Sequence, residues 1–177
     1  MSKSRVATVW LDGCSGCHMS ILDMDERLIE LGGRFDLVYS PLVDTKEYPE
    51  NVDIVLVEGA VSTREDLEKV RKIRQRTKIV VSLGDCAVTA NVPSMRNRFP
   101  VEAVEQRAYF ENAQFNNQVP RIVVPPLLPT SRPVHEFARV DLFVPGCPPS
   151  ADTIYFVLTE LLAGRMPDLS DKTRFGA

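Results

Sequence analysis

The four cysteines are the residues of this chain with the most distinctive chemistry: Cys14, Cys17, Cys86 and Cys147. Their local sequences are GCSGC, LGDCA and PGCPP, so each lies in a segment bent by glycine or proline. Glycine lets a backbone approach a bulky ligand, and proline fixes the course of a loop. A disulfide framework is typical of small secreted chains, whereas intracellular thiolates more often bind metal. The cysteines indicate a four-thiolate metal site; scattered buried thiols are the simpler alternative.

The elements that must position these cysteines follow from the pattern of apolar residues. Five apolar, β-branched segments predict strands; they are 5–11, 35–39, 52–57, 78–83 and 141–144. Helical spacing of apolar residues runs from Ile21 to Leu31 and stops at Gly32. A second helix follows an S-x-x-E capping box at Ser62 and Glu65, and a last helix runs from near residue 150 to residue 164.

Alternating strands and helices predict a mainly parallel sheet with helices on both faces. Five strands suit a flavodoxin-like, doubly wound α/β fold, and we expect residues 1–177 to form a single domain. The C-terminal ends of parallel strands line one edge, where ligands bind. Cys14 and Cys17 follow the first predicted strand, Cys86 the fourth and Cys147 the fifth. The fold therefore brings four thiols that are distant in sequence to one edge.

The spacing of the thiols favours iron over zinc. Structural zinc prefers two C-x-x-C pairs, and this chain has one pair and two single cysteines. A [4Fe–4S] cluster is larger and accepts a split set of four thiolates. Helices are expected to begin after the cysteine loops, so that backbone N–H groups and helix dipoles face an anionic cluster. We expect one [4Fe–4S] cluster, and a structural zinc scaffold remains the alternative.

Longer segments around these residues resemble the small subunit of [NiFe] hydrogenases. The segments are WLDGCSGCHMSILDMDE, VLVEGAV, SLGDCAVTANVP and VPGCPPSADTI, and the similarity extends over nearly the whole chain. It is greatest to the soluble, bidirectional, NAD-reducing type. The resemblance implies that Cys14, Cys17, Cys86 and Cys147 ligate the cluster nearest the nickel–iron site of a large subunit.

The resemblance also implies the partners. The chain is expected to be the electron-transfer subunit of a hydrogen:NAD⁺ oxidoreductase, with the NiFe site in the large subunit and NAD reduced by diaphorase subunits that carry flavin and iron–sulfur clusters. Periplasmic and membrane-bound relatives add C-terminal cysteines and a twin-arginine signal, which this sequence lacks. We therefore expect one cluster and a cytoplasmic location. The quinone-reductase subunit of complex I has adjacent cysteines where this chain has Cys14-Ser15-Gly16-Cys17, so a complex I-like role is the second alternative.

Three other residues near the cysteines have two interpretations each. Glu58 follows the third predicted strand; the resemblance implies that it frames the cluster or the subunit junction, and an acid near a helix start is the equal alternative. His18 could donate to a cluster sulfur, but we favour solvent or a local bond. Trp10, within the first predicted strand, is expected in the core.

Composition and motifs exclude several classes of function. The net charge of −3 argues against binding nucleic acid through its phosphates. The apolar runs are too short to span a membrane. No G-x-G-x-x-G or phosphate loop is present, so the chain alone is not expected to bind NAD. FMN at the switch point of the sheet is possible, although the cluster ligands use the same edge. The segment 92–134 is irregular, holds seven of the thirteen prolines, and is expected to contact a partner.

Overall fold

A parallel sheet of five strands lies at the centre of the computed structural model, which describes residues 3–173. The strands run in the order β2-β1-β3-β5-β7. Their bounds are Ser4–Trp10 for β1, Phe35–Tyr39 for β2, Val52–Glu58 for β3, Thr77–Leu83 for β5 and Leu142–Val144 for β7. This order is the flavodoxin-like one. The predicted α/β class is confirmed, and the predicted strands lie within one residue of the observed bounds.

Both faces of the sheet are apolar because the three central strands are runs of β-branched and aliphatic residues. Successive side chains point to opposite faces. One face carries Val6, Ile54, Leu56, Val81 and Leu83. The other carries Ala7, Val9, Val55, Val57 and Val80. Each face therefore needs its own helical cover.

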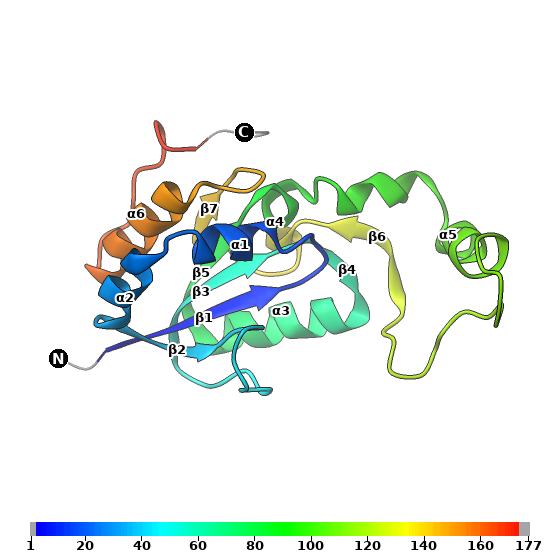
Figure 1. Cartoon of the computed structure of the whole chain (residues 1–177), viewed down its shortest axis with the longest axis horizontal. Coiled ribbons are helices and arrows are strands. Elements are labelled where there is room, and N and C mark those ends of the chain that lie inside the picture. Colours follow the sequence, from blue (N-terminus) through cyan, green and yellow to red (C-terminus); the bar gives the residue numbers. More distant parts are fainter. Residues whose placement is uncertain (1–2, 174–177) are drawn as a thin grey trace.

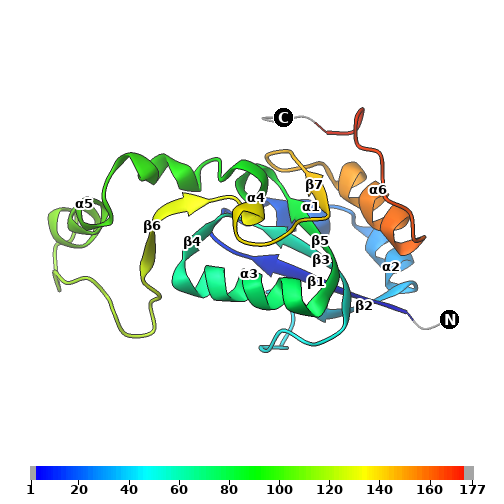
Figure 2. The ribbon, with the colours of Figure 1, turned by 180° about the vertical axis from the view of Figure 1, so that it is seen from behind.

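Helices cover the two faces unequally. The helices α1 (Gly16–Leu22), α2 (Glu26–Gly32) and α6 (Ala151–Leu162) lie over the first face (Figure 1). Helix α3 (Arg64–Arg76) lies over the second face, where Val70 and Ile73 are buried (Figure 2). No helix among residues 3–173 is both long enough and apolar enough to cross a membrane.

The single helix predicted from Ile21 to Leu31 is wrong, because the structure has two short helices there. Met24 N and Asp25 N donate to Ile21 O and Leu22 O, at 3.3 and 3.0 Å, which closes a turn. Asp25 then has a φ of 51°. This left-handed residue breaks the helix, yet the apolar spacing continues across the break and both helices face the same core.

The capping box of α3 lies one residue later than predicted. Thr63 Oγ1 accepts from Asp66 N at 3.1 Å, and Asp66 Oδ2 accepts from Thr63 N at 2.9 Å. Ser62 and Thr63 both lie in the short strand β4 (Val61–Thr63), but the Ser62 hydroxyl donates to Ser131 at 2.6 Å and so does not cap the helix. The predicted cap is therefore displaced by one residue.

The segment after β5 is more ordered than its prolines suggested. Its elements are α4 (Asp85–Thr89), the 3₁₀ helix η1 (Pro93–Arg98), α5 (Val101–Gln106), the π-helical turn η2 (Arg107–Glu111), β6 (Leu127–Arg132) and the 3₁₀ helix η3 (Val134–Glu136). Strand β6 pairs antiparallel with β4, which the sequence did not predict. Residues 99–126, here named the arm, extend away from the sheet, and none of them is buried (Figures 1 and 2).

Candidate metal centre

The four cysteines follow three strands of the same parallel sheet, as predicted. Cys14 and Cys17 come after β1, Cys86 after β5 and Cys147 after β7. Cys17 is buried, Cys86 is partly exposed, and Cys14 and Cys147 are exposed. Parallel strands end at one edge, so all three loops emerge there. The site thus has one inner thiol and two at the molecular surface.

Backbone hydrogen bonds join the loops of Cys86 and Cys147. Gly84 N donates to Val144 O at 2.8 Å, and Asp85 N donates to Gly146 O at 2.9 Å. The Asp85 carboxylate accepts in return from Gly146 N at 2.7 Å. Asp85, the first residue of α4, therefore ties the two loops together. Two cysteines far apart in sequence are fixed relative to one another.

A second set of bonds ties the Cys14–Cys17 loop to the end of β3. Asp12 and Ala60 exchange backbone hydrogen bonds of 3.1 and 2.7 Å. Gly59, at φ 91°, allows this close approach, because a Cβ there would lie 2.8 Å from Asp12 O. The strand order of the sheet reverses between β1 and β3, and paired backbone occupies this switch point. The sequence suggests the switch point as a possible binding site for FMN.

Cys17 lies against the start of the Cys86 loop. Its thiol donates to Leu83 O at 3.7 Å. Gly84, at φ 82°, leaves the space for this sulfur, because a Cβ at that position would overlap Cys17 Sγ. On the outer side, Asn91 Nδ2 donates to Cys147 Sγ at 3.8 Å. The thiols are therefore supported by neighbouring groups, although the loops are irregular.

The thiols also act on one another electrostatically. Burial raises the pKa of the Cys17 thiol, and the negative charges of Glu58 and of the other three cysteines raise that pKa further. Burial likewise raises the pKa of Cys86, with a hydrogen bond from the Val92 backbone as the opposing influence. Four thiolates crowded at one edge need a cation to compensate their charge, and binding a metal would release their protons.

The donor set suits an iron–sulfur cluster. All four groups are thiols, which are the ligands that such clusters take. Among residues 3–173, no three Cys, His, Asp or Glu side chains are gathered as the ligands of one metal ion would be. In a [4Fe–4S] cluster each cysteine binds a different iron, so the ligands stand farther apart than those of a single ion. The cysteines fit the group expected from the sequence.

Glu58 and His18 form a buried pair next to this edge. Glu58 Oε2 accepts from the backbone N of His18 at 3.0 Å and also contacts its ring Nδ1. The two residues are 2% and 4% exposed, so of the two favoured options for His18 the solvent position is wrong, and the ring instead bonds to neighbouring protein groups. His18 Nε2 lies 3.0 Å from Thr8 Oγ1, which donates to Ser40 Oγ at 2.9 Å. Glu58 thus accepts from the first turn of α1, which fits its interpretation as an acid near a helix start, and its role in framing a cluster stays a prediction.

The sequence carries a signal for this network that apolar periodicity alone does not reveal. Thr8 and Glu58 point to the face of the sheet that α1, α2 and α6 cover. The other residues of β1 and β3 on this face are mostly apolar. A buried polar side chain on such a face needs a partner, and His18 on α1 is within reach. Trp10 was predicted in the core and is instead 45% exposed. It is the last residue of β1, at the point where the chain leaves the sheet.

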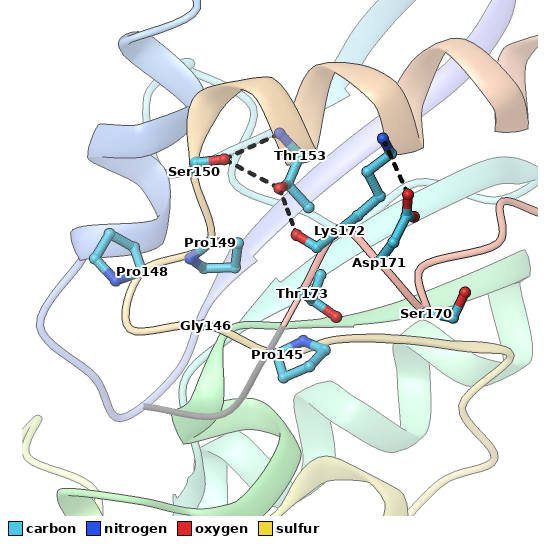
Figure 3. A pocket seen from close by; sticks show the side chains of 10 residues that line it. All are labelled: Pro145, Gly146, Pro148, Pro149, Ser150, Thr153, Ser170, Asp171, Lys172 and Thr173. Carbon is cyan, nitrogen blue, oxygen red and sulfur yellow. Dashed lines mark hydrogen bonds and ion pairs between the residues drawn. The ribbon is translucent and has the colours of Figure 1, made fainter. Parts of the chain in front are cut away.

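A cavity of about 380 Å³ opens beside the Cys147 loop (Figure 3). Pro148 and Pro149 form one wall, and the start of α6 meets residues 170–173 at the other. Its polar groups are already paired. Thr153 Oγ1 lies 3.0 Å from Ser150 Oγ and donates to Lys172 O at 3.1 Å. The Lys172 ammonium lies 3.7 Å from Asp171.

Comparison with known proteins gives consistent matches. A family model described as NADH ubiquinone oxidoreductase, 20 kDa subunit, matches residues 14–161. The delta subunit of the NAD-reducing hydrogenase HoxS from Cupriavidus necator is 41% identical, over 94% of this chain and 82% of that protein. The G subunit of the vhu F420-non-reducing hydrogenase from Methanocaldococcus jannaschii is 35% identical, over 95% of this chain but 59% of that protein.

Solved structures agree with these matches. A chain of the NAD⁺-reducing [NiFe]-hydrogenase in its H2-reduced state superimposes with a TM-score of 0.93 and 39% identity, covering 98% of this chain and 99% of that one. A chain of the Ni-Fe-Se hydrogenase from Desulfomicrobium baculatum superimposes with a TM-score of 0.61 and 20% identity. The match covers 97% of this chain and 68% of that chain, and it shows that the two share a fold.

Proposed function

This chain belongs to the family of the 20 kDa subunit of NADH ubiquinone oxidoreductase, and from that premise we propose that it is the electron-transfer subunit of a cytoplasmic NAD-reducing [NiFe] hydrogenase. One observation carries the proposal. Four cysteines from three strand ends share one sheet edge, in a chain that is 41% identical to a subunit of an NAD-reducing hydrogenase. The hydrogenase relatives favour this activity over other activities of the family.

We assign Cys14, Cys17, Cys86 and Cys147 as the ligands of one [4Fe–4S] cluster. A bound cluster of this type supplies one-electron transfer at a potential that its surroundings set. The chain's own residues hold the thiols in place: Asp85 and Gly146 join two of the loops, and Glu58 fixes the third. Burial around Cys17 keeps water from the inner side of the site.

The partners follow from the same proposal. Hydrogen is split at the NiFe site of a large subunit, and NAD⁺ is reduced by diaphorase subunits that carry flavin and iron–sulfur clusters. The exposed arm and the exposed thiols Cys14 and Cys147 give this chain surfaces for such neighbours. Neither a nucleic acid nor a membrane is among the proposed partners.

Two alternatives make different chemical predictions. A complex I-like subunit would deliver electrons to quinone, and the family match alone is compatible with it. A structural zinc scaffold would give a colourless protein without a reducible centre. Assaying quinone against NAD⁺ as acceptor, and iron against zinc in the purified protein, separates both from the proposal.

FMN binding by this chain remains a prediction from the flavodoxin-like topology. The backbone pairing of Asp12 with Ala60 at the switch point offers it no support. Flavin released by acid from the purified chain, compared with that from the whole complex, tests it. Flavin in the complex alone would assign FMN to the diaphorase subunits.

The decisive experiment replaces Cys14 by alanine in the assembled complex. Hydrogen-driven NAD⁺ reduction is expected to fall to background, because electrons must cross this subunit. NADH oxidation by an artificial dye is expected to persist, because flavin and NAD belong to the diaphorase. Ser15→Gly is the matched control: it keeps every thiol and suits the left-handed φ of 61° at that residue.

Subunit stoichiometry on the same samples distinguishes a lost relay from failed assembly. If the Cys14→Ala complex is fully assembled and still reduces NAD⁺ with hydrogen at the control rate, the relay role is wrong. If NADH–dye activity is lost in parallel, this chain helps to form the flavin site instead.

A further inference from the structure

His18 follows the buried cysteine directly and is itself almost completely buried. Its exposed fraction is 4%, and that of Cys17 is 8%. Both of its ring nitrogens have partners: Nδ1 contacts Glu58, and Nε2 lies 3.0 Å from Thr8 Oγ1. A buried imidazole with two fixed partners has one orientation, because rotation would leave polar atoms unpaired in the core.

Glu58 binds His18 twice through the same oxygen. Its Oε2 accepts from the backbone N–H of His18 at 3.0 Å and contacts the ring of that residue. The N–H lies in the first turn of α1, whose donors have no partner within the helix. One carboxylate oxygen therefore fixes both the start of the helix and the side chain that follows Cys17.

The network extends from α1 across the sheet. Thr8 on β1 donates to Ser40, and Ser40 Oγ accepts from Leu42 N at 3.1 Å. Thr8, Ser40 and Glu58 are 6%, 3% and 2% exposed. The polar chain thus anchors the first turn of α1 to β1, to β3 and to the segment after β2.

We propose that His18 is a positioning residue for the Cys14–Cys17 pair: its contact with Glu58 sets where these thiols stand before a cluster is bound. The inference rests on the proposed cluster and adds to it the side chain that orients two of its ligands. Of the two ring contacts, the one to Glu58 matters more, because the same oxygen also holds the backbone of α1. The contact to Thr8 orients the ring.

Two substitutions separate these contacts. In His18→Asn the amide nitrogen replaces Nδ1 and can donate to Glu58, whereas in His18→Gln the longer amide reaches toward Thr8. His18→Ala removes both contacts. We expect four irons per chain and a wild-type reduced-state EPR spectrum for His18→Asn. For His18→Ala and His18→Gln we expect iron content at least twofold lower and shifted g-values.

Two controls keep a general loss of stability apart from positioning. Ile73→Val shortens a buried side chain on the opposite face, which lowers stability without touching the cysteine loops, and should leave iron content and g-values unchanged. His135→Ala removes the chain's other histidine, which is exposed. All variants are prepared as the full chain in its complex, and thermal unfolding is measured on the same samples.

The outcomes are distinct. If His18→Ala loads four irons with unchanged g-values, or if His18→Asn and His18→Gln are equally impaired, His18 is not a positioning residue. If Ile73→Val shifts the g-values as His18→Ala does, the effect is one of stability and the inference is overturned. A wild-type chain without iron overturns the proposed function, and this inference with it.

Discussion

Gly84 leaves the space that the Cys17 sulfur occupies. At the φ of 82° of Gly84, a Cβ on this residue would point at Cys17 Sγ and overlap it. The relationship joins two loops that are far apart in sequence. It also means that the position of the inner thiol depends on a residue that has no side chain.

Gly84→Ala is therefore expected to displace the Cys17 loop. The positive φ alone costs about 1–3 kcal/mol for a residue with a side chain, and the overlap adds to it. Iron content of the purified complex and the denaturant midpoint of the full chain should both fall. Gly32→Ala is the matched control, because a Cβ at Gly32 meets nothing within 4 Å; it should be neutral or slightly stabilising. Equal behaviour of the two variants would contradict the account.

Cys86→Ser is expected to abolish or convert the cluster. A serine alkoxide binds iron less well than a thiolate, and no other cysteine lies in this loop to replace it. The measurements are iron per chain and the EPR spectrum of the reduced complex. Four irons with an unchanged spectrum would show that Cys86 is not a ligand.

Asp141→Asn is expected to lower stability at neutral pH by about 1–3 kcal/mol, the range for a hydrogen bond to a charged group. Burial raises the pKa of the Asp141 carboxyl, but the Val80 N–H and the Arg74 guanidinium outweigh it and hold that pKa below its usual value. The carboxylate accepts from these groups at 2.8 and 2.5 Å.

A depressed carboxyl pKa fixes the direction of the pH dependence. The stabilisation is complete above the unfolded value of about 3.9 and is lost as the pH falls through the lower, folded value. Denaturant unfolding at a series of pH values should show the difference between wild type and Asp141→Asn shrinking below about pH 4. Asp36→Asn, in an exposed ion pair with Lys3, should differ little from wild type at any pH. A difference for Asp141→Asn that persists in acid would contradict this origin.

The arm should govern how the chain behaves without its partners. Phe115, Ile122 and Val123 are 86%, 88% and 96% exposed. Exposed apolar side chains grouped in this way promote association. Val123 also has a φ of 71°, which asparagine tolerates better than a β-branched residue. We expect Ile122→Ser with Val123→Asn to reduce self-association of the full chain expressed alone, measured by size exclusion.

The same pair of substitutions should weaken copurification of the large subunit, which we expect to cover the arm. Ile29→Ser is the control, because Ile29 is 80% exposed but lies on α2. If the arm variant matches Ile29→Ser in both self-association and copurification, the arm is not the contact.

The sequence predicted the sheet well because its signal is local: runs such as VDIVLV can be buried only in a strand that is covered on both faces. The positions of the cysteines at strand ends followed from that topology. What could not be predicted depended on contacts across the chain. Ser62 was the predicted cap, but its hydroxyl binds Ser131 on β6, and Thr63 caps the helix instead.

His18 illustrates the same limit. A single histidine beside a cysteine has no periodic pattern, so its burial depends on Thr8 and Glu58, which lie on other strands. Thr8 and Glu58 are recognisable in the sequence as polar residues within apolar runs. That both contact the same helix follows only from how β1 is aligned with β3, and in this register Trp10 pairs with Glu58.

The distribution of the cysteines over three strand ends has a consequence for the order of assembly. Parallel strands need long crossover connections, so their contacts close late and slowly during folding. In an unfolded chain only Cys14 and Cys17 stay close to one another, so the complete set of four ligands does not exist. Only the folded sheet presents all four ligands, so a cluster binds the folded chain more tightly than the unfolded one. Its binding therefore stabilises the fold by mass action. We therefore expect the sheet to form before all four thiols can hold a cluster.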